Sequence, residues 1–234
     1  MGLKLITAPS VEPLTLADAY VQCQVDLSGS PPASDSDDWF NATIPVVRQQ
    51  AENELARALV TQTWELWSDE FPRPLLDDEA RDGSYYGGSL RRYPRTHNWK
   101  AIEIPLPPLQ SVSSIKYIDT TGVEQTLDPL DYIVDDSTVP AKIVPAIGKC
   151  WPSVQCQPGA VKIRFVCGYP PTGSPPNYRA NIPPAIRHWM LLLLANWFRN
   201  REATWQVVSS QTQQAAPYVD GMLFPFKVLG NGAR

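Results

Sequence analysis

Four aspartates close together are the clearest candidates for chemistry in this sequence. Asp128, Asp131, Asp135 and Asp136 could supply the paired carboxylates that a hydrolase uses as general acid and general base. A proline follows the first of them and a serine follows the last, and both contexts are typical of turns in which aspartate accepts backbone hydrogen bonds. We therefore interpret the four residues as turn residues. The alternative hypothesis is a hydrolase with Asp131 and Asp135 as its carboxylates.

The histidines and cysteines form no recognisable catalytic or metal-binding motif. His97 and His188 stand far apart, and none of the four cysteines belongs to a C-x-x-C pair, so we expect no metal site. The sequence also lacks the G-x-S-x-G elbow, the P-loop and the G-x-G-x-x-G motif. We predict a protein without enzyme activity and without a cofactor. For the cysteines we expect buried free thiols, with a Cys150–Cys156 disulfide as the alternative.

Composition and charge narrow the class further. The chain has 234 residues, of which 43% are hydrophobic, as in a globular protein of one large or two small domains. Its 24 acidic residues outnumber its 20 Lys and Arg residues, which argues against holding nucleic acid by phosphate neutralisation. The sequence begins without the apolar core of a signal peptide, and its longest apolar run is too short to span a bilayer. We expect neither secretion by a signal peptide nor membrane association.

Two helices are expected near the start of the chain. Thr15 and Asp18 have the spacing of a capping box, and apolar residues then repeat at helical spacing as far as Cys23. Ser36 is the predicted N-cap of a second, longer helix. Pro45 interrupts that helix, so we expect a kink or a restart there. The apolar stripe of the second helix is formed by Val47, Ala51, Leu55 and Leu59, with Arg48, Glu52 and Arg57 outside it.

A third helix is expected from about Pro183 to Glu202. Prolines suit its first turn, and Arg199 and Arg201 at its end interact favourably with the helix dipole. Its middle is apolar on every face, and such a helix must be covered on every face. We therefore expect another subunit to cover part of it. The apolar residues concerned include Trp189, Met190, Leu194, Trp197 and Phe198.

Between the second and third helices the sequence has the pattern of β-strands. Alternation is clearest from Ala160 to Cys167, where apolar residues face one way and Lys162 and Arg164 the other. The residues 120–122 predict a hairpin turn. Residues 69–100 form a long irregular stretch, acidic at first and basic at its end, of the kind that is usually functional or disordered. Further strands are expected at Thr63–Trp67, Ile102–Leu106, Val112–Asp119, Val123–Leu127, Tyr132–Val134 and Lys142–Val144. The fold class predicted from these elements is α+β, in a protein that forms oligomers.

The end of the chain combines a polar part with an apolar part. Residues 204–234 are first rich in Gln and Ser and then carry Leu223, Phe224 and Phe226. An apolar anchor of this kind needs a groove, either on its own domain or on a partner. We predict an extended C-terminal tail that carries such an anchor.

Five stretches, taken together and in order, carry a resemblance to one protein family. They are LITAPSVEPLTLADAYVQCQVD, ELARALVTQTWELWSDEFP, IPLPPLQSVSSIKYIDTTGVEQTLDPLDYIV, PGAVKIRFVCGY and IPPAIRHWMLLLLANWFRNREA. Over most of residues 3–203 the chain resembles the head–tail connector (adaptor) family of long-tailed bacteriophages and prophages. The most specific parts are PLPPLQSVSSIKY and PPAIRHWMLLLLANWFRNRE. No catalytic motif takes part in the resemblance.

The resemblance implies a helical bundle core, formed by residues 1–61 and 183–203. A β-rich domain at 62–182, with the long loop 70–100, would be inserted between the second and third main helices, and 204–234 would be the tail. Subunits of this family form a ring, usually of twelve, beneath the portal protein. The ring extends the DNA channel, docks the stopper or tail protein and helps to retain the packaged genome until ejection.

A protein of this family would belong to the virion, at the neck between head and tail, and would be assembled in the host cytoplasm. DNA would pass through its channel without sequence-specific binding, and no membrane would be involved. The third helix and the apolar anchor would contact other subunits or the portal, through Trp189, Met190, Leu194, Trp197, Phe198, Arg199, Arg201, Leu223, Phe224 and Phe226. The 70–100 stretch looks longer than in the family, so we expect partner contacts there, at Tyr85, Tyr86, Arg91, Arg92 and Arg95.

A second hypothesis from a different class is a β-rich carbohydrate-binding module associated with a phage tail. Such a module would use exposed Trp and Tyr side chains as platforms for sugars. It predicts glycan binding that depends on Trp99 or Tyr85 and no contact with a portal protein.

Overall fold

The structure of the protein is a computed structural model of the full chain. It describes residues 2–25, 34–72, 101–174, 176–200 and 221–228, and for residues 34 and 35 it describes the backbone only. Six of the predicted contact residues lie outside the described residues, so their predicted roles stay predictions. They are Arg201, Tyr85, Tyr86, Arg91, Arg92 and Arg95, and His97 and Trp99 lie outside as well.

The described chain is α+β, as predicted, with three α-helices and two antiparallel sheets. Contacts between Cα atoms divide it into two compact units. The sheet unit comprises Met1–Thr7 and Thr63–Val166, and the helical unit comprises Ala8–Gln62 and Cys167–Arg234. The helical bundle as a core and the insertion of a β-rich domain into it remain predictions.

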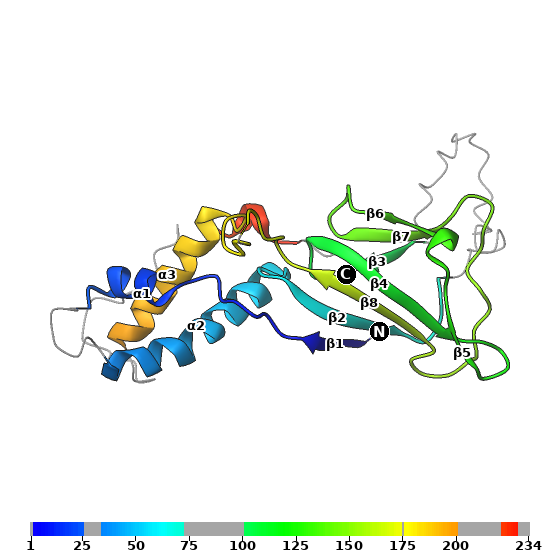
Figure 1. The fold of residues 1–234 in the computed structure, drawn as a ribbon, viewed down its shortest axis with the longest axis horizontal. Coiled ribbons are helices and arrows are strands. Elements are labelled where there is room, and N and C mark those ends of the chain that lie inside the picture. The colour runs from blue at the N-terminus through cyan, green and yellow to red at the C-terminus, as the bar shows by residue number, and fades with distance from the viewer. Residues whose placement is uncertain (1, 26–33, 73–100, 175, 201–220, 229–234) are drawn as a thin grey trace, which may run out of the picture. The chain divides into compact units, whose positions relative to one another are not determined.

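One sheet has five strands in the order β1-β2-β8-β4-β5 (Figure 1). The strands are β1 Gly2–Thr7, β2 Gln62–Ser68, β8 Val161–Cys167, β4 Leu109–Ile118 and β5 Glu124–Thr126. The predicted hairpin at residues 120–122 is confirmed, because it joins the antiparallel pair β4 and β5. Asp119 closes the turn: its backbone N–H donates to the Val123 carbonyl at 2.9 Å, and its side chain accepts from Thr121 N–H at 2.9 Å.

The other sheet has three strands in the order β3-β7-β6. They are β3 Ile102–Ile104, β7 Ala141–Pro145 and β6 Tyr132–Asp135, and both pairs are antiparallel. Ile143 stands at the centre, opposite Ile102 on one side and opposite Val134 on the other. Ile102, Ile104 and Ile143 are buried, so this small sheet has an apolar inner face.

The alternation predicted for β8 is confirmed by its burial pattern. Val161, Ile163, Phe165 and Cys167 are each at most 1% exposed. Lys162 lies on the opposite face, where its Nζ stands 5.0 Å from the centre of the Trp67 ring.

β1 is a strand that we did not predict. It forms an edge of the five-stranded sheet, with Leu3 opposite Leu66 and Leu5 opposite Trp64. All six of its residues are exposed, so the contrast between buried and exposed positions that marks an internal strand is absent. The alternating sequence Leu3-Lys4-Leu5 is the only local pattern that could have indicated it.

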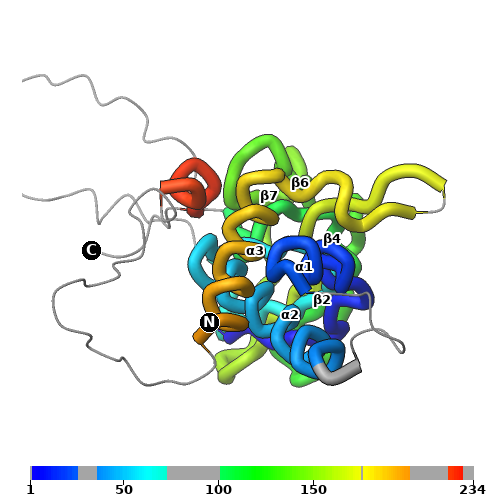
Figure 2. Tube along the Cα trace, turned by 90° about the vertical axis from the view of Figure 1, so that its left-hand side faces the viewer, coloured from blue at the N-terminus to red at the C-terminus, as the bar shows by residue number. Residues whose placement is uncertain are grey.

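The helical unit contains α1 Leu16–Cys23, α2 Ser34–Leu55 and α3 Pro184–Arg199 (Figure 2). The predicted capping box of α1 is confirmed, because Asp18 N–H donates to Thr15 Oγ1 at 3.0 Å and Thr15 N–H donates to Asp18 Oδ2 at 2.9 Å. The structure begins α2 at Ser34, two residues before the predicted cap at Ser36. None of these helices, in the part of the chain that is described, is long and apolar enough to cross a membrane.

Of the kink or restart predicted at Pro45, the restart is wrong, since α2 continues through Pro45 as one helix. The kink stays a prediction. Proline removes one backbone hydrogen bond, but tertiary packing supplies most of the stability of a helix within a protein. Phe40 and Ile44 before the proline and Val47 and Ala51 after it are all buried in the same core. Burial on both sides of Pro45 therefore holds the two halves of α2 in one helix.

The core of the helical unit combines all three helices with residues before α1, after α2, before α3 and near the C-terminus. The predicted stripe of α2 is confirmed, because Val47, Ala51, Leu55 and Leu59 are fully buried, although Leu59 lies beyond the end of the helix. The other buried members of this core are Leu14, Ala19, Phe40, Ile44, Val60, Ile182, Ile186, Trp189, Met190, Leu194 and Leu223.

Candidate interface surfaces of the helical unit

Part of α3 turns apolar residues toward the core of its own unit. Trp189 is 7% exposed, and Met190 and Leu194 are fully buried. These three predicted contact residues are therefore enclosed by their own chain in this structure. A helix that is apolar on every face gives no sequence signal for which face is turned inward, so this assignment had to come from the structure. His188, by contrast, is exposed on α3.

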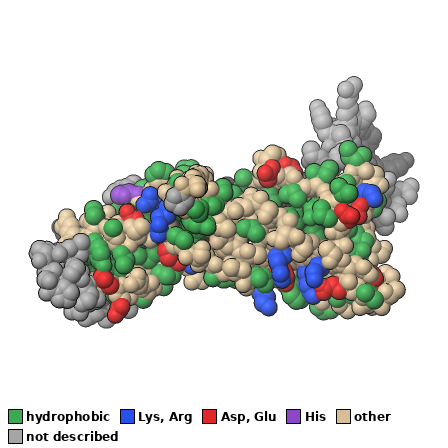
Figure 3. Space-filling model, viewed as in Figure 1, with side chains coloured by type: hydrophobic (Ala, Val, Ile, Leu, Met, Phe, Trp, Pro, Cys, Tyr) green, Lys and Arg blue, Asp and Glu red, His purple; other side chains and the backbone are tan. Residues whose placement is uncertain are grey.

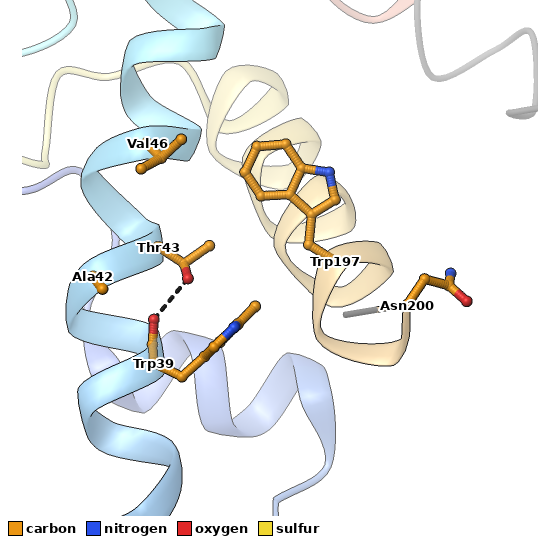
Figure 4. Close-up of a pocket in the computed structure, with 6 residues that line it drawn as sticks. All are labelled: Trp39, Ala42, Thr43, Val46, Trp197 and Asn200. Atoms are coloured by element: carbon orange, nitrogen blue, oxygen red, sulfur yellow. Dashed lines mark hydrogen bonds between the residues drawn. The ribbon is translucent and has the colours of Figure 1, made fainter. Parts of the chain in front are cut away.

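The other end of α3 borders an open groove between α2 and α3 (Figure 4). The groove has a volume of about 320 Å³, and the Trp39 and Trp197 rings project into it from the two helices. Phe198 fixes one wall, because its ring packs against the Trp39 ring with centroids 5.4 Å apart. Thr43 Oγ1 donates to the Trp39 carbonyl at 2.7 Å, so this hydroxyl is satisfied within α2. The lining is completed by Ala42, Val46 and Asn200.

The groove is an apolar surface that the described chain leaves open. Val46 is 50% exposed at the groove, and Trp197 is half-buried. Arg199, another predicted contact residue, is exposed in the last turn of α3. Two indole rings and an exposed valine on one side of a unit are typical of surfaces that bind another protein.

The apolar anchor at the end of the chain docks on its own helical unit. Leu223 is 2% exposed, and Phe226 packs against the same core. The backbone is fixed at two points: Val228 N–H donates to the Leu55 carbonyl at 3.0 Å, and Arg57 Nε donates to the Phe226 carbonyl at 2.9 Å. The sequence left open whether the anchor binds its own domain or a partner, and in this structure it binds its own domain.

Phe224 differs from its neighbours in this anchor. It begins a short 3-10 helix, Phe224–Phe226, and 68% of it is exposed. It is the one aromatic residue among the large hydrophobic residues that are exposed in the described parts of the chain. Docking on the chain's own unit therefore leaves one of the three predicted anchor residues free to contact another molecule.

A mostly buried carboxylate, that of Glu52 with 12% of its side chain exposed, organises the end of α2 beside this docking site. Glu52 accepts hydrogen bonds from Arg48 Nη1 at 2.6 Å, from Leu59 N–H at 2.9 Å and from Gln62 Nε2 at 2.8 Å. Burial raises the pKa of Glu52 by more than these donors lower it. From the sequence Glu52 was expected only to lie outside the apolar stripe, and its burial was missed.

The cysteines differ from the prediction of buried free thiols. All four are free, but Cys150 and Cys156 are exposed and only Cys167 is buried. The two exposed cysteines lie in an irregular stretch between β7 and β8, where no sheet or helix covers them. Burial, together with the nearby Glu52 carboxylate, raises the pKa of Cys167 to about 12, so it is an inert thiol rather than a nucleophile.

Two of the four candidate catalytic aspartates accept hydrogen bonds from residues two positions later, in agreement with the turn interpretation. Asp128 accepts from the Leu130 N–H at 2.9 Å, and Asp135 accepts from the Ser137 N–H at 3.0 Å. The bonds from Ser137 lower the pKa of Asp135. Asp131 forms an ion pair with Lys149, with Nζ and Oδ1 3.0 Å apart. Among the residues that the structure describes, no group of three or more His, Cys, Asp or Glu could hold a metal ion.

In the described part of the sheet unit, several Lys and Arg side chains are paired with carboxylates. Figure 3 shows Lys and Arg side chains next to Asp and Glu side chains on one face of the molecule. Arg164 Nη2 lies 2.9 Å from Glu65 Oε2. Lys116 and Lys162 both approach Glu124, at 3.3 and 3.8 Å. Such pairs do not provide the unneutralised basic surface that phosphate binding requires.

The fold of this chain is shared with chains of virus-like particles. A chain from the neck of an empty gene transfer agent particle, computed with C6 symmetry, superposes with a TM-score of 0.66 at 17% identity, and each chain is covered in full. A chain from the neck of the native particle, computed with C12 symmetry, gives a TM-score of 0.58 at 18% identity, again with full coverage of both.

A chain from the virion of the native gene transfer agent particle gives a TM-score of 0.65 at 17% identity, with 98% of this chain and 97% of that chain covered. At these identities the likeness establishes a shared fold over the whole chain. No family model and no curated protein sequence matches this chain.

Leu223 and Phe224 give a matched pair of variants for the docked anchor. We expect Leu223→Ala to lower the free energy of unfolding by about 2–5 kcal/mol, because it removes a buried side chain from the core. Phe224→Ala should change it by about 0.5 kcal/mol or less, because the ring is mostly exposed. Urea unfolding followed by circular dichroism measures both. Equal effects of the two substitutions would show that the anchor does not dock as described.

Proposed function

We propose that this protein is a structural subunit of the neck of a tailed phage or phage-like particle, where it forms a ring in the head–tail connector. More specifically, it acts as the adaptor beneath the portal protein, extends the DNA channel and docks the stopper or tail protein. The observation that carries the proposal is the likeness over the full length of both chains to neck chains of gene transfer agent particles, at TM-scores of 0.66 and 0.58. Those necks were computed with C6 and C12 symmetry, which favours a ring of twelve or of a related number of subunits.

The charge distribution is compatible with a channel through which DNA slides. The chain has a formal net charge of −4, and the Lys and Arg side chains of the five-stranded sheet that we describe stand beside carboxylates. A lumen of this kind would not neutralise phosphates strongly enough to retain DNA. DNA would therefore pass without sequence-specific binding.

The contacts between subunits would use the surfaces that the helical unit leaves open. In this proposal the groove at Trp39 and Trp197 and the exposed Phe224 meet neighbouring subunits or the portal. Trp189, Met190 and Leu194 would support α3 from within, because they are buried in the core of the helical unit. In a ring, each subunit contacts its two neighbours through two different, complementary surfaces. Such a head-to-tail contact gives a closed ring when the rotation between neighbouring subunits completes a circle.

Mass photometry of the purified full chain tests the ring directly, first alone and then mixed with portal rings. Twelve copies of the 26.1 kDa chain would have a mass of about 313 kDa. We expect a species of this mass, or a portal ring that gains about a dozen copies of the chain. A chain that stays monomeric at all concentrations and salt conditions, and does not bind the portal, contradicts the proposal.

Val46 tests whether the groove is a subunit contact. We expect Val46→Glu to raise the concentration needed for ring assembly at least tenfold, about 1.4 kcal/mol, by placing a charge in a surface that assembly buries. Stability of the single chain should change by about 0.5 kcal/mol or less, since Val46 is half exposed and Glu is a good helix former. The matched control is Ile147→Glu, at a residue of the sheet unit that is 96% exposed. Equal assembly of both variants would show that the groove takes no part in the ring.

A further inference from the structure

The last described segment of the chain, Gly221–Val228, is held by contacts of three kinds. We call it the C-terminal segment. Leu223 enters the apolar core, Val228 N–H donates to the Leu55 carbonyl at 3.0 Å, and Arg57 Nε donates to the Phe226 carbonyl at 2.9 Å. Lys227 Nζ adds an exposed ion pair with Glu54 Oε2 at 3.2 Å. The hydrogen-bond and ion-pair partners of this segment, Glu54, Leu55 and Arg57, lie at the end of α2 and just after it, and we call this surface the docking site.

The stretch of chain between α3 and the C-terminal segment is much longer than is needed to join these two elements within one subunit. Asn200, after α3, lines the groove with Trp39 and Val46, and the C-terminal segment docks at Leu55. At 1.5 Å rise per residue along α2, Leu55 lies about 14 Å from Val46 and about 24 Å from Trp39. Residues 201–220 supply 20 residues between the two ends, enough to span about 66–72 Å when extended.

We infer that in the assembled ring the docking site of each subunit takes the C-terminal segment of a neighbouring copy. This inference rests on the proposed function, because it requires a ring. The length of residues 201–220 allows the segment to reach an equivalent site on the next subunit, whereas a path along its own α2 would need only a fraction of that length.

Exchange of the segment keeps every contact that the structure shows. Leu223 would occupy the same place in the core, and Val228, Arg57 and Lys227 would keep their partners, so no new complementary surface has to exist. What changes is that each of these contacts then joins two subunits. An element exchanged between identical subunits is a low-cost route to assembly for this reason.

Exchange also favours closure of the ring. In an open row of subunits, one docking site and one C-terminal segment remain without an exchanged partner, whereas in a closed ring every subunit both gives and receives one. The docked segment carries Phe224 with 68% of its surface exposed, so a further apolar contact between subunits is available beside the exchanged one.

The ion pair between Lys227 and Glu54 gives a direct test with the unmodified full chain. Chains with natural isotopes and chains labelled with ¹⁵N are mixed in equal amounts while dissociated, and are then assembled. A water-soluble carbodiimide joins the Glu54 carboxylate to the Lys227 amine, which lie 3.2 Å apart, as an amide. Mass spectrometry of the digest then identifies the linked peptide pair. If the segment is exchanged, about half of these pairs contain one labelled and one unlabelled peptide.

The sheet unit provides the matched control. Lys149 and Asp131 lie 3.0 Å apart within one sheet unit, so their linked peptides should carry a single isotope in the same sample. The variant Lys227→Arg, which keeps the charge but lacks the amine, should lose the Glu54 linkage and retain the control linkage.

Three results would overturn the inference. Rings that yield only single-isotope Glu54–Lys227 pairs would show that the segment stays on its own subunit. Rings that contain both isotopes but yield no such pair, while the Lys149 control is linked, would show that the segment leaves the docking site for another partner. In both cases the ring of the proposed function stands. A protein that forms no ring would remove the proposed function and the exchange together.

Discussion

The hydrogen bonding of the mostly buried Glu52 carboxylate, whose side chain is 12% exposed, is the constraint on which the helical unit depends. A carboxylate removed from water is costly unless donors surround it, and here Arg48, the Leu59 N–H and Gln62 supply hydrogen bonds of 2.6–2.9 Å. To reach Glu52, the chain must turn sharply after α2 and pass back beside it. That turn puts Leu59 and Val60 into the core and leads the chain to the start of β2. The pKa of Glu52 is raised, which shows that burial outweighs even this set of donors.

Two other parts of the chain contact the end of α2 and the turn that follows it. Gly168, at a φ of +105°, follows β8 and comes so near the turn that a Cβ atom there would stand 2.1 Å from the Val60 carbonyl oxygen. The C-terminal segment then docks on the last turn of α2, through Leu55 and Arg57. The end of α2 and the residues just after it thus contact other parts of the same chain, whereas the other half of α2 borders an open groove. This difference between the two ends of one helix provides two unlike surfaces, as a head-to-tail ring requires.

Sequence reasoning succeeded where a local pattern has one structural solution. The capping box of Thr15 and Asp18 and the alternation of β8 fixed their elements, because short-range hydrogen bonds and a two-residue period allow few alternatives. It failed where tertiary packing decides. The restart that was one of two alternatives at Pro45 does not occur, because both halves of α2 share one core. Glu52 is mostly buried because residues seven and ten positions later donate to it. The inner face of α3 could not be predicted, because Trp189 and Trp197 are equally apolar in the sequence. The groove at Trp39 depends on two helices that are distant in sequence and was not foreseen.

Cryo-electron microscopy of the assembled protein tests the central claim, that the chain is a ring subunit of a phage-like neck, most directly. We expect closed rings with twelvefold or sixfold rotational symmetry and a central channel wide enough for double-stranded DNA. In these rings the groove at Trp39 and Trp197 should be covered by a neighbouring subunit. Open filaments, twofold dimers or particles without a central channel would contradict it.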